Sequence, residues 1–322
     1  MKKLFLLIGV VMLFSANSFA QTDITELLKA GQKDANTLAQ PYLKPFGEML
    51  GKGLNNGWYT SAKPHKLLGF DLTFTASYIK APSSALSFDV SQLELSEFEH
   101  VPTSSAIAPT VAGDIDDLPK LRLKDDITGL SEFDMPNGTG MDFLPIPMIS
   151  AGVGLPYGFE IKGRFIPKVE IGDAGKLNLW GLGLQKDIKD YIPGVKHVPV
   201  LNVSVLAAYT KFASELQVDD PNFDGHLDIS ANGLTTRLLI GANLPVVAFY
   251  TGLGYGKSSS DFDLLGVYRP TATSDPISLA YSTTGFDMNV GMRIRLGVIA
   301  LHADYTLGDY SSITAGLGIS FR

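Results

Sequence analysis

Apolar and polar residues alternate one by one along long stretches of this chain. Within 68–78 every second residue is apolar or aromatic, and the residues between them are Gly, Asp, Thr or Ser. The stretches 159–165, 286–296, 299–307 and 312–321 repeat the pattern. A period of two places the two sets on opposite faces of a β-strand. The pattern therefore predicts an all-β chain whose strands have one apolar and one polar face.

These stretches are long, and their apolar faces carry almost no charge. Several reach about 10 residues, the length with which a tilted strand crosses a bilayer. Strands of soluble proteins average about five or six residues. A basic side chain on the lipid face costs about 2–4 kcal/mol at the midplane, so the lack of charge is informative. We expect an antiparallel transmembrane β-barrel, with a secreted β-sandwich as the alternative.

The first twenty residues have the form of a secretory signal peptide. Lys2 and Lys3 precede an apolar run at 4–14, and the small residues Ser18 and Ala20 occupy the −3 and −1 positions of a cleavage site. The run is too short for a transmembrane helix, which needs about 20 residues, so an N-terminal anchor is the weaker interpretation. We therefore expect export to the bacterial outer membrane without a helical span.

Composition excludes several classes of function. The chain has no cysteine, which excludes disulfides, thiolate metal sites and thiol nucleophiles. Its net charge is −7 with no basic run, so we expect no nucleic-acid partner. The sequence contains no nucleophile elbow, HExxH, P-loop or dinucleotide fingerprint. We expect no enzyme, no catalytic residue, no cofactor and no metal site. A barrel hydrolase using His302 and Asp304, two residues apart on one strand, is the alternative.

Counting the alternating stretches tests the barrel. The candidate strands are 66–79, 87–97, 145–154, 158–171, 177–186, 199–216, 225–242, 246–264, 278–296, 298–307 and 312–322. Because bacterial single-chain barrels have an even number of strands, we expect a further strand in 98–144, where 120–125 is a weak candidate. We predict about 12 strands, with 14 as the alternative. Tight connections at 155–157, 243–245 and Gly297 should face the periplasm.

Residues before the first strand do not alternate. Apolar side chains recur at roughly helical spacing, Pro41 is expected to end a first helix, and a second short helix should run over 45–54. The segment could lie in the lumen as a plug, beneath the barrel in the periplasm, or on the membrane surface. We favour a plug that packs through Phe46, Trp58 and Tyr59. The predicted organisation is a signal peptide at 1–20, an N-terminal helical plug or periplasmic segment at 21–65, and the barrel at 66–322.

Charged residues recur on the face expected to line the lumen. They are Glu160, Lys162, Arg164, Arg237, Asp287, Arg293, Arg295, His302 and Asp304. One interpretation is a binding or conduction path in which Arg293 and Arg295 attract anionic groups. The other is a network of ion pairs that fills a narrow barrel or docks the plug. We favour the network, because the signs are mixed and small barrels need polar side chains to fill them.

An acidic stretch at 220–225 resembles the start of a calcium loop. Asp228 would stand at its ninth position, but Ala231 occupies the twelfth, where such a loop has Glu, and the flanks alternate like strands. We interpret the stretch as an acidic outer loop.

Four stretches resemble a known group of proteins. PYLKPFG at 41–47, LNNGWY at 54–59, AKPHKLLGFD at 62–71 and DIKDYIP at 187–193 are similar to an uncharacterised family of Bacteroidota outer-membrane β-barrels of unknown function. More distantly, a helical segment before a barrel resembles long-chain fatty-acid transporters.

The resemblance implies a barrel that passes or binds a small apolar or amphipathic molecule through a plugged lumen. The alternative is a non-transporting barrel that serves as scaffold, adhesin or subunit of a surface complex. The implied partners are outer-membrane lipid, the barrel-assembly machinery and a small hydrophobic or amphipathic ligand.

Overall fold

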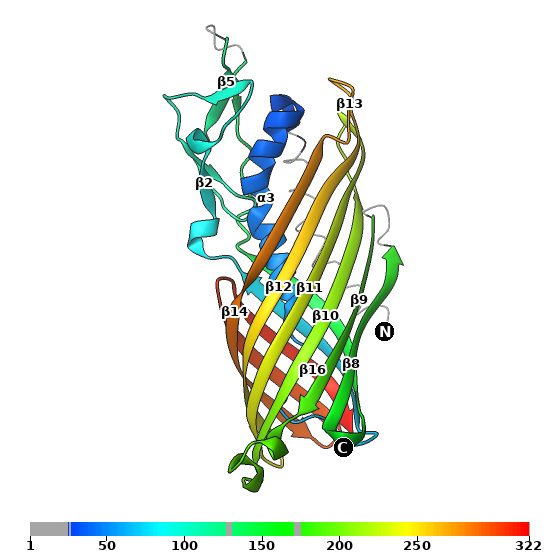
Figure 1. Ribbon diagram of the computed structural model, residues 1–322. Coiled ribbons are helices and arrows are strands. Elements are labelled where there is room, and N and C mark those ends of the chain that lie inside the picture. The colour runs from blue at the N-terminus through cyan, green and yellow to red at the C-terminus, as the bar shows by residue number, and fades with distance from the viewer. Residues whose placement is uncertain (1–24, 26, 127–130, 171–174, 322) are drawn as a thin grey trace.

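Ten long antiparallel strands close into a barrel (Figure 1). They are β1 (Phe70–Lys80), β7 (Phe143–Gly154), β8 (Phe159–Glu170), β9 (Gly175–Asp187), β10 (Leu201–Gln217), β11 (Phe223–Asn243), β12 (Val247–Tyr268), β14 (Ile277–Leu296), β15 (Ile299–Leu307) and β16 (Ser311–Phe321). β1 pairs with both β7 and β16, and β12 pairs with both β11 and β14, so the order of strands forms a ring. A two-residue strand, β13 (Thr273–Ser274), pairs only with β12. The predicted antiparallel barrel is confirmed.

The computed structural model describes residues 25, 27–126, 131–170 and 175–321. The predicted signal peptide at 1–20 lies outside these residues. Among the described helices, none has the length and apolar character needed to cross a membrane.

Among the described residues the barrel has ten strands, which corrects the expected 12 and its alternative 14. Ten of the eleven candidate stretches form barrel strands, but 87–97 instead contains β2 (Ser87–Asp89) and a 3-10 turn, η3 (Val90–Gln92). The weak candidate at 120–125 becomes β5 (Lys120–Leu123), which pairs with short strands outside the barrel.

Residues 81–126 and 131–142 form a cap at one end of the barrel, on one side of it in Figure 1. Its elements besides β2, η3 and β5 are η2 (Ser83–Ala85), β3 (Phe98–His100), β4 (Ile107–Pro109) and β6 (Phe133–Asp134). Val90 and Leu121 belong to one buried cluster with Leu38 of the N-terminal segment. Several apolar side chains of the cap are therefore buried in a cluster shared with a helix, which explains why an apolar stretch of strand-like composition lies outside the wall.

The outward face of the barrel is the apolar face expected from the alternation. Leu72, Val290 and Leu317 are more than half exposed, whereas their strand neighbours Thr73 and Asn289 are buried toward the lumen. A closed sheet with an apolar exterior is what a lipid bilayer requires of a spanning β-structure.

The strands from β10 to β14 extend beyond this apolar surface. Outward positions of β12 change from Phe249 and Tyr255 to Lys257 and Asp261 as the strand approaches its outer end. Tyr255 packs against Phe286 on the outward face, with 5.0 Å between ring centroids. Aromatic residues commonly border the lipid-facing band of such barrels. The outer parts of these strands therefore form a tall wall beside the cap.

The connections define the two ends. The turns at 155–158, 244–246 and 297–298 lie at the same end as Phe70 and Phe321, which are paired across β1 and β16. The cap and the connections at 218–222 and 269–276 lie at the other end. Short turns face the periplasm in bacterial barrels, so this arrangement agrees with the predicted orientation.

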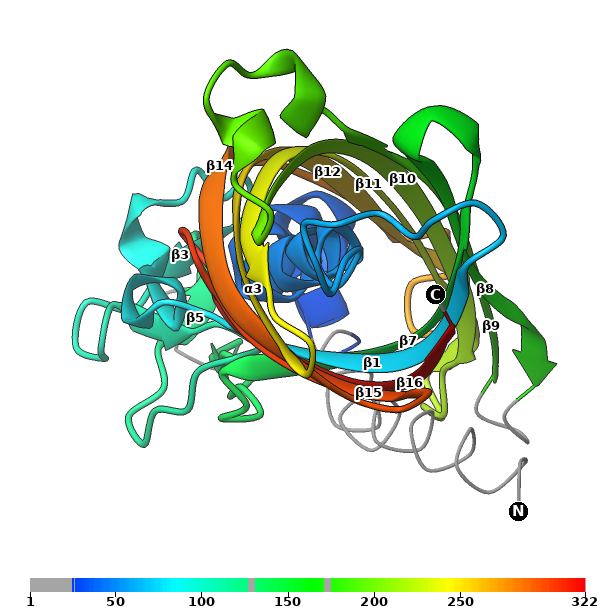
Figure 2. The ribbon, with the colours of Figure 1, turned by 90° about the horizontal axis from the view of Figure 1, so that it is seen from below.

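One helix, α3 (Gly31–Asn55), enters the lumen, where Figure 2 shows it enclosed by the ring. A 3-10 turn, η1 (Leu28–Ala30), precedes it. The predicted end of a helix at Pro41 is wrong, because α3 continues through Pro41 and Pro45. Carbonyls beside these prolines accept hydrogen bonds from outside the helix: Gln40 O from Tyr281 Oη at 3.0 Å and Tyr42 O from the Val111 backbone at 2.9 Å. The prolines remove the helical donors of the Thr37 and Pro41 carbonyls, and the external bonds to neighbouring carbonyls and the burial of the helix stabilise it in spite of that loss.

Candidate functional site

Residues 31–66, called the plug segment below, run from the cap down the lumen to the periplasmic end. Near the cap, Asn36 donates to Pro276 O and accepts from the Ser278 backbone, at 2.8 and 3.0 Å. Near the periplasm, His65 contacts Glu160 of β8. Of the three locations left open by the sequence, the lumen is the one observed.

Glycines on α3 allow the helix to lie directly against the wall. A Cβ at Gly51 would come within 2.4 Å of Ser258 Oγ on β12, and one at Gly47 within 2.7 Å of the Tyr281 ring on β14. The Gly47 carbonyl accepts a hydrogen bond from Ser260 Oγ at 3.0 Å. The glycine excess noted in the sequence thus serves close packing of backbone against strands.

The carboxyl end of α3 meets a buried arginine. Arg164 of β8 donates to the carbonyls of Leu54, at 3.0 Å, and Asn56. Thr210 Oγ1 donates to the Leu54 carbonyl as well, at 3.1 Å. The last carbonyls of a helix lack helical partners and carry partial negative charge, so a cation is well placed here. The Arg164 guanidinium also lies over the ring of Trp58, 3.9 Å from its centroid.

Tyr59 packs deeper in the lumen beside an ion pair. Its hydroxyl donates to Asn289 Oδ1 at 2.5 Å, and its ring meets that of Tyr250 edge-on at 5.8 Å. Arg237 and Asp287 form a two-pronged pair, with distances of 2.5 and 3.1 Å. The Arg237 guanidinium lies 5.9 Å from the Tyr59 ring centroid.

The pair considered for catalysis does not form. Asp304 accepts from Tyr250 Oη at 3.1 Å and from Asn289 Nδ2 at 3.3 Å. Among the described residues no ion pair joins Asp304 to His302, whose Nε2 atom is buried without a hydrogen-bond partner. Both side chains share the lumen face as expected, but Asp304 orients Tyr250 and Asn289, not a histidine.

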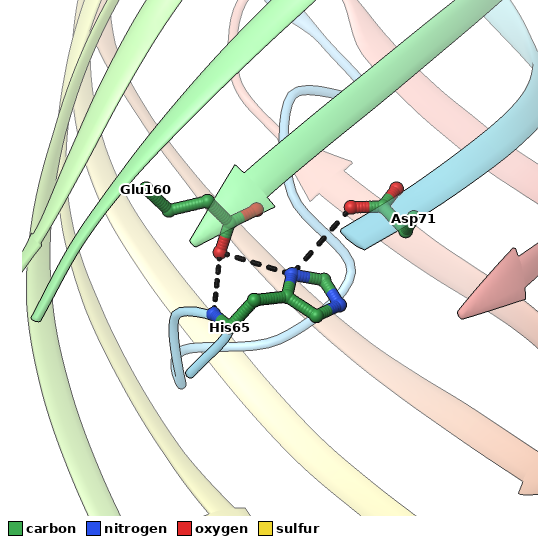
Figure 3. A group of neighbouring side chains, drawn as sticks. All are labelled: His65, Asp71 and Glu160. Atoms are coloured by element: carbon green, nitrogen blue, oxygen red, sulfur yellow. Dashed lines mark hydrogen bonds and ion pairs between the residues drawn. The ribbon is translucent and has the colours of Figure 1, made fainter. Parts of the chain in front are cut away.

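A second charged group closes the periplasmic end of the plug segment (Figure 3). His65 Nδ1 lies 3.2 Å from Glu160 Oε2 and 3.6 Å from Asp71 Oδ1 of β1. Glu160 Oε2 also accepts from the His65 backbone at 2.8 Å, while its other oxygen contacts the Lys162 ammonium. The plug segment is thereby joined to two strands of the wall.

Beside this group lies a basic vestibule, an open cavity of about 720 Å³ at the periplasmic end. Lys63, Lys66, Arg293 and Arg295 line it together with His65. Arg293 and Arg295, which the sequence singled out as attracting anions, therefore face this vestibule and not a channel along the axis.

Most of the predicted lumen residues hold the plug segment or fill the space around it. Trp58 and Tyr59 pack in the lower lumen, and Phe46 packs edge-on against Phe262 of β12 at 5.8 Å. The sequence did not single out His65 and Asp71, which complete the group at Glu160.

An apolar cavity of about 60 Å³, called the upper cavity below, lies between α3 and the wall. Phe46, Leu50 and Leu54 of α3 line one side. The strands contribute Leu144, Ile146, Pro147, Ile166, Leu177, Leu179, Phe212, Ser214, Leu216 and Ile229. Among the described residues of this lining, Ser214 alone is polar. The sequence did not identify this cavity, because its lining comes from a helix and five strands far apart in the chain.

The upper cavity lies at a place where the wall is incompletely paired. β7 and β8 are in register from Gly154 and Glu160 up to Ser150 and Arg164, and no further among the described residues. The outer parts of both strands continue past this point, and Figure 2 shows the outer ends of β8 and β9 turned away from the ring. We call the unpaired stretch between 143–149 and 165–170 the seam.

Prolines account for the missing pairing. The backbone groups of Asp142 and Gly154 bond to residues that flank β1. Because successive strand residues bond to opposite sides, Pro145 and Pro147 occupy positions that face β8, where they offer no N–H. Pro167 lies in a bulge of β8. Proline in a sheet is confined to edges and bulges. The three prolines in these two predicted strands therefore indicate an unpaired edge in the barrel wall.

Comparison with known protein families identifies the family of this chain. Residues 1–321 match a family described as Family of unknown function (DUF6588). The chain belongs to this family. With its closed sheet and apolar exterior, this DUF6588 member is an outer-membrane β-barrel with an internal helix. No curated protein matches the chain.

Solved barrels are similar at low identity. The translocator domain of autotransporter NalP from Neisseria meningitidis is 10% identical, with a TM-score of 0.36, and the match covers 85% of this chain and 92% of that one. The outer membrane protein OprG from Pseudomonas aeruginosa is 10% identical, with a TM-score of 0.33 and coverage of 80% and 98%. Ail, the attachment invasion locus protein of Yersinia pestis, is 16% identical, with a TM-score of 0.26 and coverage of 54% and 95%.

Proposed function

We propose that this barrel binds a small apolar or amphipathic molecule in the upper cavity and passes it through the seam while the plug segment stays in place. The observation that carries the proposal is the position of the cavity. Leu144 and Ile146 of β7 and Ile166 of β8 line it, and these residues belong to the two strand ends that do not pair.

The plug segment makes passage along the axis unfavourable. Among the described residues, none lines both the upper cavity and the basic vestibule. Between them, Arg164 holds the end of α3, and Tyr59 is bonded to Asn289. An axial route would have to break these buried contacts. The charge-assisted bonds of Arg164 are worth about 1.5–3 kcal/mol each, and the neutral Tyr59–Asn289 bond about 0.5–1.5 kcal/mol. A route through the seam breaks no strand pairing between the described residues of β7 and β8.

The size of the upper cavity implies that it must widen to accept a ligand. About 60 Å³ is well below the roughly 300–1,000 Å³ of sites for small molecules. Because the outer part of β8 is not bonded to β7, it can move outward without losing hydrogen bonds on that side. Ile149 and Phe165, at the inner end of the seam, are on the lipid-facing side of their strands. A ligand leaving here would enter the membrane.

The lining selects the class of ligand. A cavity lined by aliphatic and aromatic side chains with a single serine favours an apolar molecule or the apolar tail of an amphipathic one. This agrees with the distant resemblance to long-chain fatty-acid transporters and with a Bacteroidota outer membrane as the setting. The proposal includes no enzymatic step and no cofactor.

A reversible cross-link tests the seam. Since the chain has no cysteine, Ile149→Cys with Phe165→Cys introduces a single pair at the position after the last paired residues. Oxidation should join β7 to β8, and reduction should restore the seam in the same protein. We expect native mass spectrometry to detect a bound lipid-sized molecule in the reduced form, and a density map to place it against α3. Equal binding in both forms, or density elsewhere, would reject the route.

The alternative of a non-transporting scaffold, adhesin or surface-complex subunit rests on the cap. The cap is a folded unit at the outer end, and α3 occupies the lumen below it. If the reduced protein carries no ligand, and exchange of exposed cap residues such as Ile107 abolishes attachment or assembly at the cell surface, this alternative is supported instead.

A further inference from the structure

The group formed by His65, Asp71 and Glu160 has the composition of a metal site (Figure 3). One ligand atom from each residue, His65 Nδ1, Asp71 Oδ1 and a Glu160 carboxylate oxygen, lies within 4.8 Å of the other two. The side chains come from the end of the plug segment, from β1 and from β8, so the group is built by three distant parts of the chain.

Two atoms in this group are buried without a hydrogen-bond partner. They are His65 Nδ1 and Asp71 Oδ1. The side chains of His65 and Glu160 are only 9% and 1% exposed, and burying an unpaired polar atom is costly. The proximity of Nδ1 to the two carboxylates does not satisfy it, because neither contact has the geometry of a hydrogen bond.

The other ring nitrogen has a partner. His65 Nε2 lies 3.1 Å from Ser320 Oγ on β16. When Nε2 carries the proton and donates to this hydroxyl, Nδ1 presents a lone pair toward the two carboxylate oxygens. Such an arrangement is repulsive unless a cation lies between them. A ligating histidine commonly donates its other N–H to a nearby oxygen, which fixes the ring.

Two of the three separations between ligand atoms match those of a tetrahedral ion, and the third is within 4.8 Å. Zinc binds nitrogen and oxygen ligands at about 2.0–2.2 Å in tetrahedral geometry, which separates neighbouring ligand atoms by about 3.4 Å. Nδ1 lies 3.2 Å from Glu160 Oε2 and 3.6 Å from Asp71 Oδ1. We propose that His65, Asp71 and Glu160 bind a divalent metal cation, with zinc as the ion that fits best, and that the ion fastens the base of the plug segment to the wall.

Neighbouring charges set the expected strength of binding. The Lys162 ammonium contacts Glu160 Oε1, and Lys63, Lys66 and Arg293 line the vestibule onto which His65 opens. These positive charges disfavour binding of a divalent cation. Glu160 Oε2 nevertheless points toward the His65 ring, and water can reach a fourth coordination position from the vestibule. The cost of the opposing charge predicts that removing the Lys162 ammonium strengthens binding. The site does not depend on the proposed ligand or its route.

The test measures metal binding directly on the full mature chain in detergent. A second group, Glu215, His226 and Asp228, could also bind a cation at the outer end, so the measurements use a His226→Ala background. After EDTA treatment, titration with zinc chloride should give one tight site per chain by calorimetry and elemental analysis. Cobalt chloride should give the absorption bands of a tetrahedral ion.

Matched variants locate the site. His65→Asn and Asp71→Asn should each weaken zinc binding at least about tenfold and abolish the cobalt bands, whereas Lys162→Met should tighten binding. His197→Ala, in an exposed turn, η7 (Val195–His197), should leave both unchanged. Heat-modifiable gel mobility shows that each variant is assembled. Substoichiometric zinc in the His226→Ala protein, or unchanged binding in assembled His65→Asn, overturns the proposal.

Discussion

Arg164 Cζ lies 3.9 Å from the centroid of the Trp58 ring, so a buried cation of the wall stacks on an aromatic residue of the plug segment. Among the described residues the Arg164 guanidinium forms no ion pair with a carboxylate. Its charge is met by the carbonyls of Leu54 and Asn56 and by the face of the indole. A single wall residue thereby holds both the end of α3 and the segment that follows it.

Arg164→Met should loosen the plug segment without preventing assembly of the barrel. The substitution leaves the Asn56 carbonyl without its donor and removes the cation–π contact, which together should cost about 3 kcal/mol. We expect more frequent and larger openings in single-channel recordings in planar bilayers. Arg295→Met, in the exposed vestibule, is the control and should record like the parent. Identical recordings from both variants would show that Arg164 does not hold the plug segment.

Gly51→Val should displace α3 from the wall. Its added atoms would meet Ser258, whose Oγ lies 2.4 Å and Cβ 2.8 Å from the position of a Cβ at residue 51. Overpacking of this kind costs about 1–3 kcal/mol, and we expect a lower thermal midpoint by gel mobility. Gly163→Ala is the matched control, since a Cβ there meets nothing within 4 Å. A midpoint unchanged by Gly51→Val would mean that the helix tolerates a wider separation from β12.

Leu317→Arg should block insertion, because it places a charge on the lipid face at a cost of about 2–4 kcal/mol. Thr75→Ser, on the lumen face of β1, keeps a hydroxyl and should assemble normally. Heat-modifiable mobility of membrane fractions distinguishes the two outcomes. Normal assembly of Leu317→Arg would contradict the assignment of the outward face.

The face of each strand could be predicted from the sequence because alternation is a local property. Whether a position on the lumen face tolerates substitution could not be predicted from the sequence. From the sequence, Ser at Gly318 is expected to be harmless on the lumen face. In the structure a Cβ there would lie 2.5 Å from Thr73 Oγ1 and 2.8 Å from the Leu72 carbonyl of the neighbouring strand. Only the register of β1 with β16 reveals this crowding.

The predicted number of strands was wrong for a related reason. The stretch 87–97 has the apolar content of a wall strand, but Val90 is buried in one cluster with residues of α3 and does not face lipid. Whether an apolar side chain is buried by lipid or by another part of the chain depends on residues far away in the sequence, and periodicity does not identify them.

The candidate site could not be predicted for the same reason. Pro145, Pro147 and Pro167 are visible in the sequence, but their position on two facing edges, beside an apolar cavity, depends on the pairing of β7 with β8.

The contact between α3 and the cap should depend on pH through Asp34. This side chain is 1% exposed and accepts hydrogen bonds from the backbones of Ser96, Glu97 and Phe98, at 2.5, 2.8 and 3.0 Å. Burial acts to raise the pKa of Asp34, but the three N–H donors outweigh it and hold the pKa below its usual value of 3.8.

Because the folded pKa is depressed, the stabilisation from Asp34 is complete above the unfolded value and is lost as the pH falls through the folded value. Amide exchange of residues 96–98 should therefore be protected at neutral pH and become faster below about pH 3.8 relative to intrinsic rates. Asp34→Asn removes the charge and should lower the local opening free energy by about 2 kcal/mol at pH 7. Its protection should then be insensitive to pH over the acid range. Parallel pH profiles for the parent and Asp34→Asn would show that the carboxylate does not hold the cap to the helix.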